Sequence, residues 1–325
     1  MIANATTNDP RAAAPPAAQR IGPAAAIDLC TVAERHLGFR PAAVRVYEET
    51  GSFVAIDRGD ALRLGGRTYL VTGTVREEGF GLEEQPKYWV KRAVDLATGV
   101  EKIVKLVFLE QFDLPFGGRR VRCFRSPAKE ARLLDVVRGH PQFMAGSSVR
   151  DRVGNLVRVI DFIPGPSLER VASSPPGGDE AYVREELPRL LWRYLPCMEG
   201  LRFLHERGER HGDVRADHVI VDRGSGLLRW IDFDYDFECP GAPFVLDVHG
   251  AGSILASLVG RGAVDCHPGL GRFAAGSRRS YAGIGELIDD LGDALSGLVS
   301  PRGLDGLPAD SAGSVARSEW RARHD

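Results

Sequence analysis

Hydrophobic and polar residues alternate over much of the first half of the chain, a pattern that predicts β-strands divided by Gly and Asp turns. Between residues 44 and 75 the runs VRVYEE, SFVAIDRG, ALRLGG and RTYLVTGTV carry this period of two. Residues 88–108 contain two further alternating runs around Thr98 and Gly99, which predicts a hairpin. Before these strands, helical spacing over residues 26–37 predicts a helix that Gly38 ends.

From about residue 125 the apolar residues recur at helical spacing. Four stretches predict helices, and short apolar runs between them predict strands, the last two of which flank the turn DRGSG. A β-rich first half followed by a helix-rich second half predicts an α+β fold of two lobes with a cleft between them. The expected helices are residues 126–140, 185–208, 244–260 and 280–299, and the expected strands are 158–163, 218–222 and 227–234.

The two ends of the chain lack these periods. Residues 1–25 are rich in Ala, Pro, Asn and Thr, which predicts a disordered tail, and residues 301–325 are expected to form a polar C-terminal tail. Residues 26–66 are interpreted as an N-terminal extension that precedes the lobes.

Composition narrows the functional classes. Hydrophobic residues make up 43% and charged residues 26% of the 325, as in ordinary soluble globular proteins, and the net charge is −2. This balance gives no electrostatic reason to expect nucleic acid or an anionic membrane as partner. The five cysteines form no C-x-x-C pair, which favours reduced thiols, and no stretch has the character of a signal peptide or a membrane span. A cytoplasmic protein is therefore expected.

Candidate chemistry is concentrated in HGDVRADHVIVDRGSGLLRWIDFD, residues 211–234. Asp213 follows a predicted long helix and precedes a short strand, so that its carboxylate on a loop could accept a proton from a substrate hydroxyl. Asp232 ends an apolar strand, a suitable place for a magnesium ligand. The two aspartates are 19 residues apart, about the length that a loop, strand, turn and strand require.

This ordered pair resembles the protein kinase-like superfamily, in which the catalytic loop H-x-D-x-x-x-x-N precedes a D-F-G-type metal motif. The resemblance covers roughly residues 67–262 and implies a kinase-like N-lobe over 67–163 and a C-lobe over 164–300. It implies that Lys105, on a predicted strand, holds the nucleotide phosphates and that Glu130, in the following helix, is its ion-pair partner. ATP and Mg²⁺ are then the expected cofactors.

Two further parts of the kinase pattern are less distinct. VIDFIPGPSLER resembles the connection between the lobes, where backbone groups from Asp161 to Ile163 could bind an adenine ring. Gly79 and Gly81 lie where kinases have a glycine-rich phosphate loop, although their spacing fits an ordinary hairpin turn equally well.

The chain also departs from the kinase pattern. His218 occupies the position of the metal-binding Asn, and imidazole is a poor ligand for the hard Mg²⁺ ion. The adjacent Asp217 could substitute for it, but the side chain of a neighbouring residue is expected to point elsewhere. Asp234 replaces the glycine of D-F-G and adds a carboxylate near the expected metal site. Three outcomes follow: catalysis with one metal, use of Mn²⁺, or a nucleotide-binding pseudokinase without turnover.

The segment after the metal motif bears on the acceptor. Asp247 follows Asp232 by only 15 positions, and the A-P-E ending of protein kinases is missing. This short connection, together with HGD and IDFD, is similar to aminoglycoside and choline phosphotransferase-like kinases. The sequence thus predicts an ATP-dependent phosphotransferase acting on a hydroxyl of a small molecule or of an atypical protein substrate, with the pseudokinase as the alternative.

Overall fold

The computed structural model describes residues 23–77, 85–173, 178–260, 266–274 and 280–298. The predicted N-terminal and C-terminal tails, apart from residues 23–25, lie outside these residues. The described residues form two compact units, each made of three stretches of chain. Unit 1 comprises the described parts of 1–112, 124–138 and 145–162, and unit 2 those of 113–123, 139–144 and 163–325.

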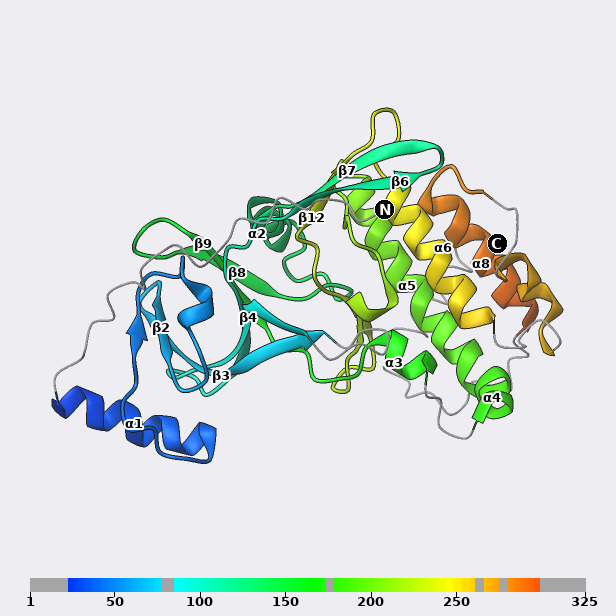
Figure 1. The fold of residues 1–325 in the computed structure, drawn as a ribbon. Helices are drawn as coiled ribbons and strands as arrows, with labels where there is room; N and C mark the ends of the chain where they lie inside the picture. Colours follow the sequence, from blue (N-terminus) through cyan, green and yellow to red (C-terminus); the bar gives the residue numbers. More distant parts are fainter. Residues whose placement is uncertain (1–22, 78–84, 174–177, 261–265, 275–279, 299–325) are drawn as a thin grey trace. The chain divides into compact units, whose positions relative to one another are not determined.

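Unit 1 is built on a seven-stranded sheet, coloured from blue to green in Figure 1. Its first two strands run parallel, and the other neighbours are antiparallel. The predicted hairpin of residues 88–108 is confirmed as the second and third of three consecutive antiparallel strands. The strand order is β1 (Val46–Tyr47), β2 (Ala61–Leu64), β3 (Arg67–Glu77), β4 (Gln85–Asp95), β5 (Glu101–Lys105), β9 (Leu156–Asp161) and β8 (Gly146–Arg150).

The N-terminal extension completes a hydrophobic core on one face of this sheet. Side chains of the extension, Tyr47 and Ile56 among them, pack with sheet residues such as Val71, Val104 and Val159. The run SFVAIDRG was predicted as a strand, and this prediction is wrong: it contains a single 3-10 turn, Phe53–Ala55. Instead of joining the edge of the sheet, the segment packs buried Ile56 and partly buried Phe53 against the hydrophobic core on the face of the sheet, while Val54 is exposed.

A buried carboxylate fastens the extension to the far end of the sheet. Asp151, which follows β8, accepts hydrogen bonds from the backbone N–H and the hydroxyl of Thr50 at 2.7 and 2.8 Å, and from the Asn155 amide at 2.9 Å. Burial alone would raise the pKa of Asp151, but the bonds from Asn155 and Thr50 outweigh it and lower the pKa.

Lys91 of β4 is fully buried beneath the extension. Its ammonium donates to the Ile56 carbonyl oxygen at 2.6 Å and to the Thr74 hydroxyl at 3.3 Å. Burial lowers the pKa of Lys91 to about 8, an effect that the charges of Asp57 and Asp60 partly offset. The charged Lys91 ammonium thus binds the extension, although burial makes the charged form less favourable than it is in water.

Two helices complete unit 1, and both were predicted. The first, α1 (Pro23–Leu37), ends at Gly38, whose φ of 74° is the left-handed conformation that glycine adopts readily. The second, α2 (Pro127–Val136), begins after Ser126, whose hydroxyl accepts the Lys129 N–H at 3.2 Å. This helix packs against β8 and β9.

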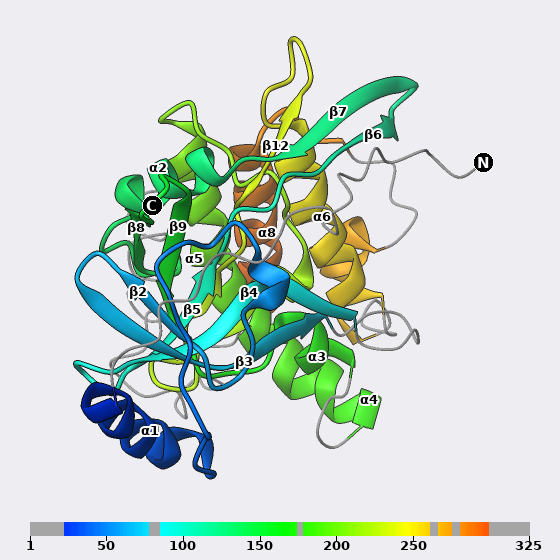
Figure 2. The same ribbon diagram turned by 60° about the vertical axis from the view of Figure 1, so that its left-hand side comes forward.

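Unit 2 is mainly helical. The long helices α5 (Leu187–His205), α6 (Val245–Val259) and α8 (Ile284–Leu298) lie side by side (Figures 1 and 2). They confirm three predicted helices, and no described helix has both the length and the apolar character needed to cross a membrane. The smaller elements are α3 (Leu168–Ser173), α4 (Gly178–Ala181), the π-turn Tyr182–Glu186, the 3-10 turns Ala216–His218 and Pro268–Phe273, and the paired strands β10 (Val219–Val221) and β11 (Leu228–Trp230).

Sequence periodicity missed one hairpin. Strands β6 (Gln111–Phe116) and β7 (Arg119–Arg125) are joined at Gly117 and Gly118, both with positive φ, and β7 pairs with β12 (Tyr235–Glu238) just after the metal motif (Figure 2). The adjacent glycines are the turn signal that could have revealed it. The α+β prediction is confirmed, and the arrangement is compatible with a two-lobed kinase-like fold.

The lowered pKa of Lys91 predicts a pH dependence of stability. Between pH 8 and 10.5 the unfolded chain binds more protons at this position than the folded chain, so the free energy of unfolding rises with pH. Relative to Lys91→Met, the wild-type protein should gain up to about 3 kcal/mol between pH 7 and pH 10.5. Urea unfolding of both proteins across this range measures the difference. Lys87→Met, a partly exposed position on the same strand, is the matched control, and a wild-type advantage that stays constant with pH would contradict the prediction.

Candidate active site

Unit 1 brings the predicted phosphate-binding lysine and its predicted partner together. The Lys105 ammonium, at the end of β5, lies 2.8 Å from Oε1 of Glu130 in α2, and both side chains are buried. The second carboxylate oxygen of Glu130 accepts a hydrogen bond from Nε of Arg158 at 2.9 Å. Arg158 was not among the predicted site residues. Its signal is an arginine in an otherwise apolar strand, LVRVI.

Of the predicted adenine-binding residues, Asp161 is the last residue of β9 in the same sheet. The backbone N–H of Asp161 donates to the Ala145 carbonyl oxygen at 2.8 Å, and its carboxylate accepts from the Lys102 ammonium at 2.5 Å. Ile163 is the first residue of the long final stretch of unit 2. The predicted phosphate-loop residues Gly79 and Gly81 lie outside the described residues.

In unit 2, the loop that carries Asp213 is held by one buried carboxylate. Asp247, in the first turn of α6, accepts the backbone N–H of His211 at 2.7 Å and that of Gly212 at 2.8 Å, and its Oδ2 lies 3.1 Å from Nε2 of His205. His205 through its imidazole and His211 through its backbone N–H thus both contact the carboxylate that holds the loop. The sequence placed Asp247 within the predicted helix 244–260 but did not reveal that its carboxylate holds the loop.

Glycine at position 212 allows the backbone conformation in which this loop binds Asp247. Gly212 has a φ of 88°, a conformation that strains residues with a Cβ, which is a local reason for the H-G-D sequence. Burial alone would raise the pKa of Asp247, but the hydrogen bond and charge of His205, the charge of His211 and the Gly212 N–H lower it. The carboxylate therefore stays ionised within its set of donors.

Asp213 is partly buried and contacts an imidazole. Its Oδ2 lies 3.4 Å from Nδ1 of His218, and its backbone N–H donates to Nδ1 of His211 at 3.3 Å. Burial, with the charges of Asp232 and Asp217, raises the pKa of Asp213, although His218 and Arg215 act against this rise. A carboxylate with a raised pKa is a better proton acceptor than an ordinary aspartate.

His218 lies between the predicted catalytic carboxylate, Asp213, and the predicted metal ligand Asp232. Its Nδ1 is 2.9 Å from the backbone oxygen of Asp213, so this nitrogen donates. Its Nε2 is 3.5 Å from Asp232 and 3.8 Å from Asp217. Both carboxylate oxygens of Asp217 accept hydrogen bonds from the Arg215 guanidinium, at 3.0 and 2.6 Å.

Asp232 and Asp234 supply the carboxylates for a metal ion. Oxygen atoms of the two side chains lie within 4.8 Å of each other, and Asp234 is buried. Among the described residues other than glycine, only Asp232 has a positive φ, 62°. Such backbone strain costs roughly 1–3 kcal/mol and is concentrated at functional sites. A pair of hard carboxylate oxygens fits Mg²⁺ or Mn²⁺.

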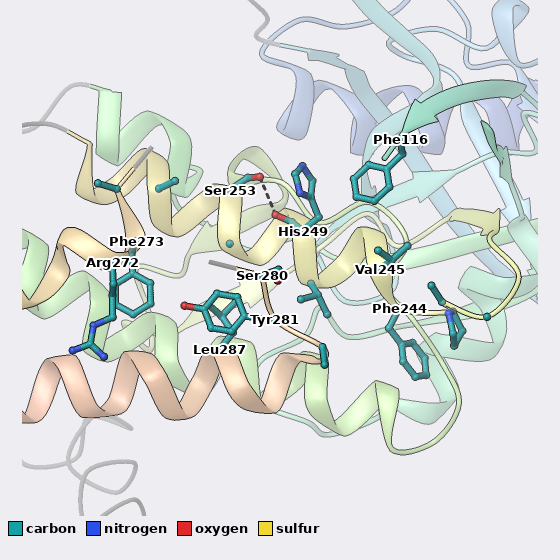
Figure 3. A pocket seen from close by; sticks show the side chains of 18 residues that line it. Phe116, Phe244, Val245, His249, Ser253, Arg272, Phe273, Ser280, Tyr281 and Leu287 are labelled. Atoms are coloured by element: carbon teal, nitrogen blue, oxygen red, sulfur yellow. Dashed lines mark hydrogen bonds between the residues drawn. The ribbon is translucent and has the colours of Figure 1, made fainter. Parts of the chain in front are cut away.

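Unit 2 also contains a pocket of about 530 Å³ (Figure 3). It borders the segment that follows the metal motif, and its walls come from that segment, α6, α8, the turn Pro268–Phe273 and the β6–β7 hairpin. None of the residues predicted for phosphoryl transfer lines it. Its principal aromatic walls are Phe116, Phe244, Phe273 and Tyr281.

Comparison with known proteins gives distant similarities to protein kinases. The chain is 28% identical over 175 residues to CBL-interacting protein kinase 17 of Oryza sativa subsp. japonica, and 26% identical over 137 residues to CBL-interacting protein kinase 25 of the same organism. These matches cover 52% and 42% of this chain, but only 34% and 25% of the relatives.

A third similarity is shorter. The serine/threonine-protein kinase CLA4 of Saccharomyces cerevisiae is 28% identical over 64 residues, which are 20% of this chain and 8% of that protein. No family model matches the chain. Together with the α+β fold, these partial similarities support a distant relationship to the protein kinase-like superfamily.

Proposed function

We propose that this protein is an ATP- and metal-dependent phosphotransferase that transfers the γ-phosphoryl group to a hydroxyl. The observation that carries the proposal is the contact of one imidazole, that of His218, with both Asp213 and Asp232. Two carboxylates that are 19 residues apart in sequence thus lie within the span of one side chain. This is the proximity needed when one carboxylate acts on the attacking hydroxyl and the other holds the metal.

Each residue has a definite role in this proposal. Asp213 orients the acceptor hydroxyl and accepts its proton, a role that its raised pKa supports. Lys105 binds the nucleotide phosphates, and Glu130 fixes the direction of its ammonium. A metal ion held by Asp232 and Asp234 would neutralise charge on the phosphates. Asp161 and Ile163 are proposed to contact the adenine, and Gly79 and Gly81 the phosphates.

The acceptor is proposed to be a small-molecule hydroxyl or an atypical protein substrate. The 15-residue connection from Asp232 to Asp247 supports this, because it leaves little chain for a peptide-binding platform. Part of that connection is strand β12, which is occupied by its pairing with β7. In its length and in the HGD and IDFD motifs, this region resembles aminoglycoside and choline phosphotransferase-like kinases.

One observation favours a second candidate, a nucleotide-binding pseudokinase. His218 replaces the oxygen ligand that a second metal would use, and its Nδ1 is occupied as a donor to the Asp213 carbonyl oxygen. Nucleotide binding without turnover is the outcome that this alternative predicts.

Replacing Asp213 tests the proposed reaction. Asp213→Asn should lower transfer from γ-labelled ATP, to water or to the protein itself, by roughly 10²- to 10⁴-fold, because the proton acceptor is lost. Asp289→Asn, an exposed carboxylate on α8, is the matched control and should retain activity. A wild-type protein that transfers no label with either Mg²⁺ or Mn²⁺ would favour the pseudokinase.

Replacing Lys105 tests nucleotide binding. ATP at about 100 times its dissociation constant should stabilise the wild-type protein by about 2.7 kcal/mol, seen as a rise in Tm. Lys105→Met should remove most of this rise, whereas Arg63→Met, which removes an exposed cation of the same sheet, should retain it. If the wild-type protein shows no rise with ATP, both candidate functions fail.

Replacing His218 tests its effect on metal use. His218→Asn keeps a donor for the Asp213 carbonyl oxygen and adds an amide oxygen, a ligand that Mg²⁺ accepts. The Mg²⁺ concentration that gives half of the ATP-dependent rise in Tm should therefore fall several-fold relative to the wild-type protein. An unchanged or higher Mg²⁺ requirement would show that position 218 does not contact the metal.

A further inference from the structure

Arg158 is a buried cation to which the proposed reaction assigns no role. It lies on β9, in unit 1, with 1% of its surface exposed. Its guanidinium donates to Oε2 of Glu130 at 2.9 Å, to the Leu156 carbonyl oxygen at 2.8 Å and to the Leu106 carbonyl oxygen at 3.3 Å. An arginine is rarely buried to this extent unless its donors are paired, and here three acceptors surround it.

Strand register explains the position of this cation. Arg158 lies directly opposite Lys105 in the antiparallel pair β5–β9, so both side chains project from the same face of the sheet. Like charges in such a cross-strand pair repel. The Glu130 carboxylate offsets this repulsion by offering Oε1 to the lysine and Oε2 to the arginine.

The two cations hold Glu130 in different ways. The guanidinium is planar, and two of its three bonds are made to backbone oxygens, one of Leu156 in β9 and one of Leu106 directly after β5, which fixes its orientation. The Lys105 side chain ends in a compact ammonium on a long, rotatable stem, and the nucleotide phosphates would compete for it. Of the two contacts that tie α2 to the sheet through Glu130, the arginine contact is the one that nucleotide binding leaves intact.

We propose that Arg158 is a positioning residue that holds Glu130, and with it helix α2, on the sheet independently of Lys105. The lysine–glutamate pair is then assembled before any nucleotide arrives, and no separate step is required to dock α2. The catalytic consequence rests on the proposed phosphotransferase function, whereas the docking of α2 does not.

Amide hydrogen exchange of α2 in the full chain tests the docking. Arg158→Met should increase exchange in α2 by about tenfold or more, because local opening becomes easier once the carboxylate loses its fixed partner. Lys105→Met should change exchange in α2 by less than about threefold, because Arg158 still holds Glu130. Equal increases in the two variants, or no increase in Arg158→Met, would overturn the proposal.

Further variants keep the test informative if Arg158→Met folds poorly. Arg158→Lys retains the charge without the planar fork and should give a smaller increase confined to α2; unchanged exchange there would count against the proposal. In a Glu130→Gln background, Arg158→Lys should add little to the exchange, since the two residues act through one contact. A full additional increase in that background would show that Arg158 acts by another route.

Measurements of kcat and KM test whether Arg158 affects catalysis through Glu130. With transfer measurable, Arg158→Lys should lower kcat by about tenfold and leave the KM for ATP within about twofold, because Lys105 remains but is less well oriented. A change in KM alone would assign Arg158 to nucleotide binding and overturn its role as a positioning residue. If the wild-type protein transfers no phosphate, the proposed function fails, while the exchange result still decides the docking of α2.

Discussion

The loop bearing Asp213 depends on a single buried carboxylate, that of Asp247. One side chain gathers two consecutive backbone N–H groups and an imidazole, and thereby joins α6, the end of α5 and the loop between them. Left unpaired, each of these groups would be costly to bury. The geometry of Asp213 is therefore set by interactions made entirely within the protein, as expected for a site that is organised before its ligand binds.

Local signals allowed much of this structure to be predicted. The spacing between Asp213 and Asp232 indicated two strands and a turn, and β10 and β11 occupy that interval. The helix around Glu130 was evident from its Ser126 start and its apolar positions. Each of these features is encoded within about twenty residues of chain, where periodicity and capping residues are informative.

Features that depend on distant partners were not predictable in this way. The role of Asp247 depends on backbone groups 35 and 36 residues away, and that of Arg158 on a carboxylate 28 residues away. The strand predicted around Ile56 failed for a related reason. Ile56 and Phe53 of this segment pack over the face of a sheet, and an alternating sequence alone does not distinguish such packing from strand pairing at an edge.

The connectivity of the two units limits the truncations and gene recombinations that would preserve either unit. Because three stretches of unit 1 alternate with three of unit 2, the chain passes between the units five times. Neither unit corresponds to a continuous piece of the gene, so no single cut or recombination point would yield one unit whole. Truncation at residue 162, for example, would leave residues 113–123 and 139–144 without the rest of their own unit. We therefore expect recombination between genes to transfer the two units together, although each unit is compact by itself.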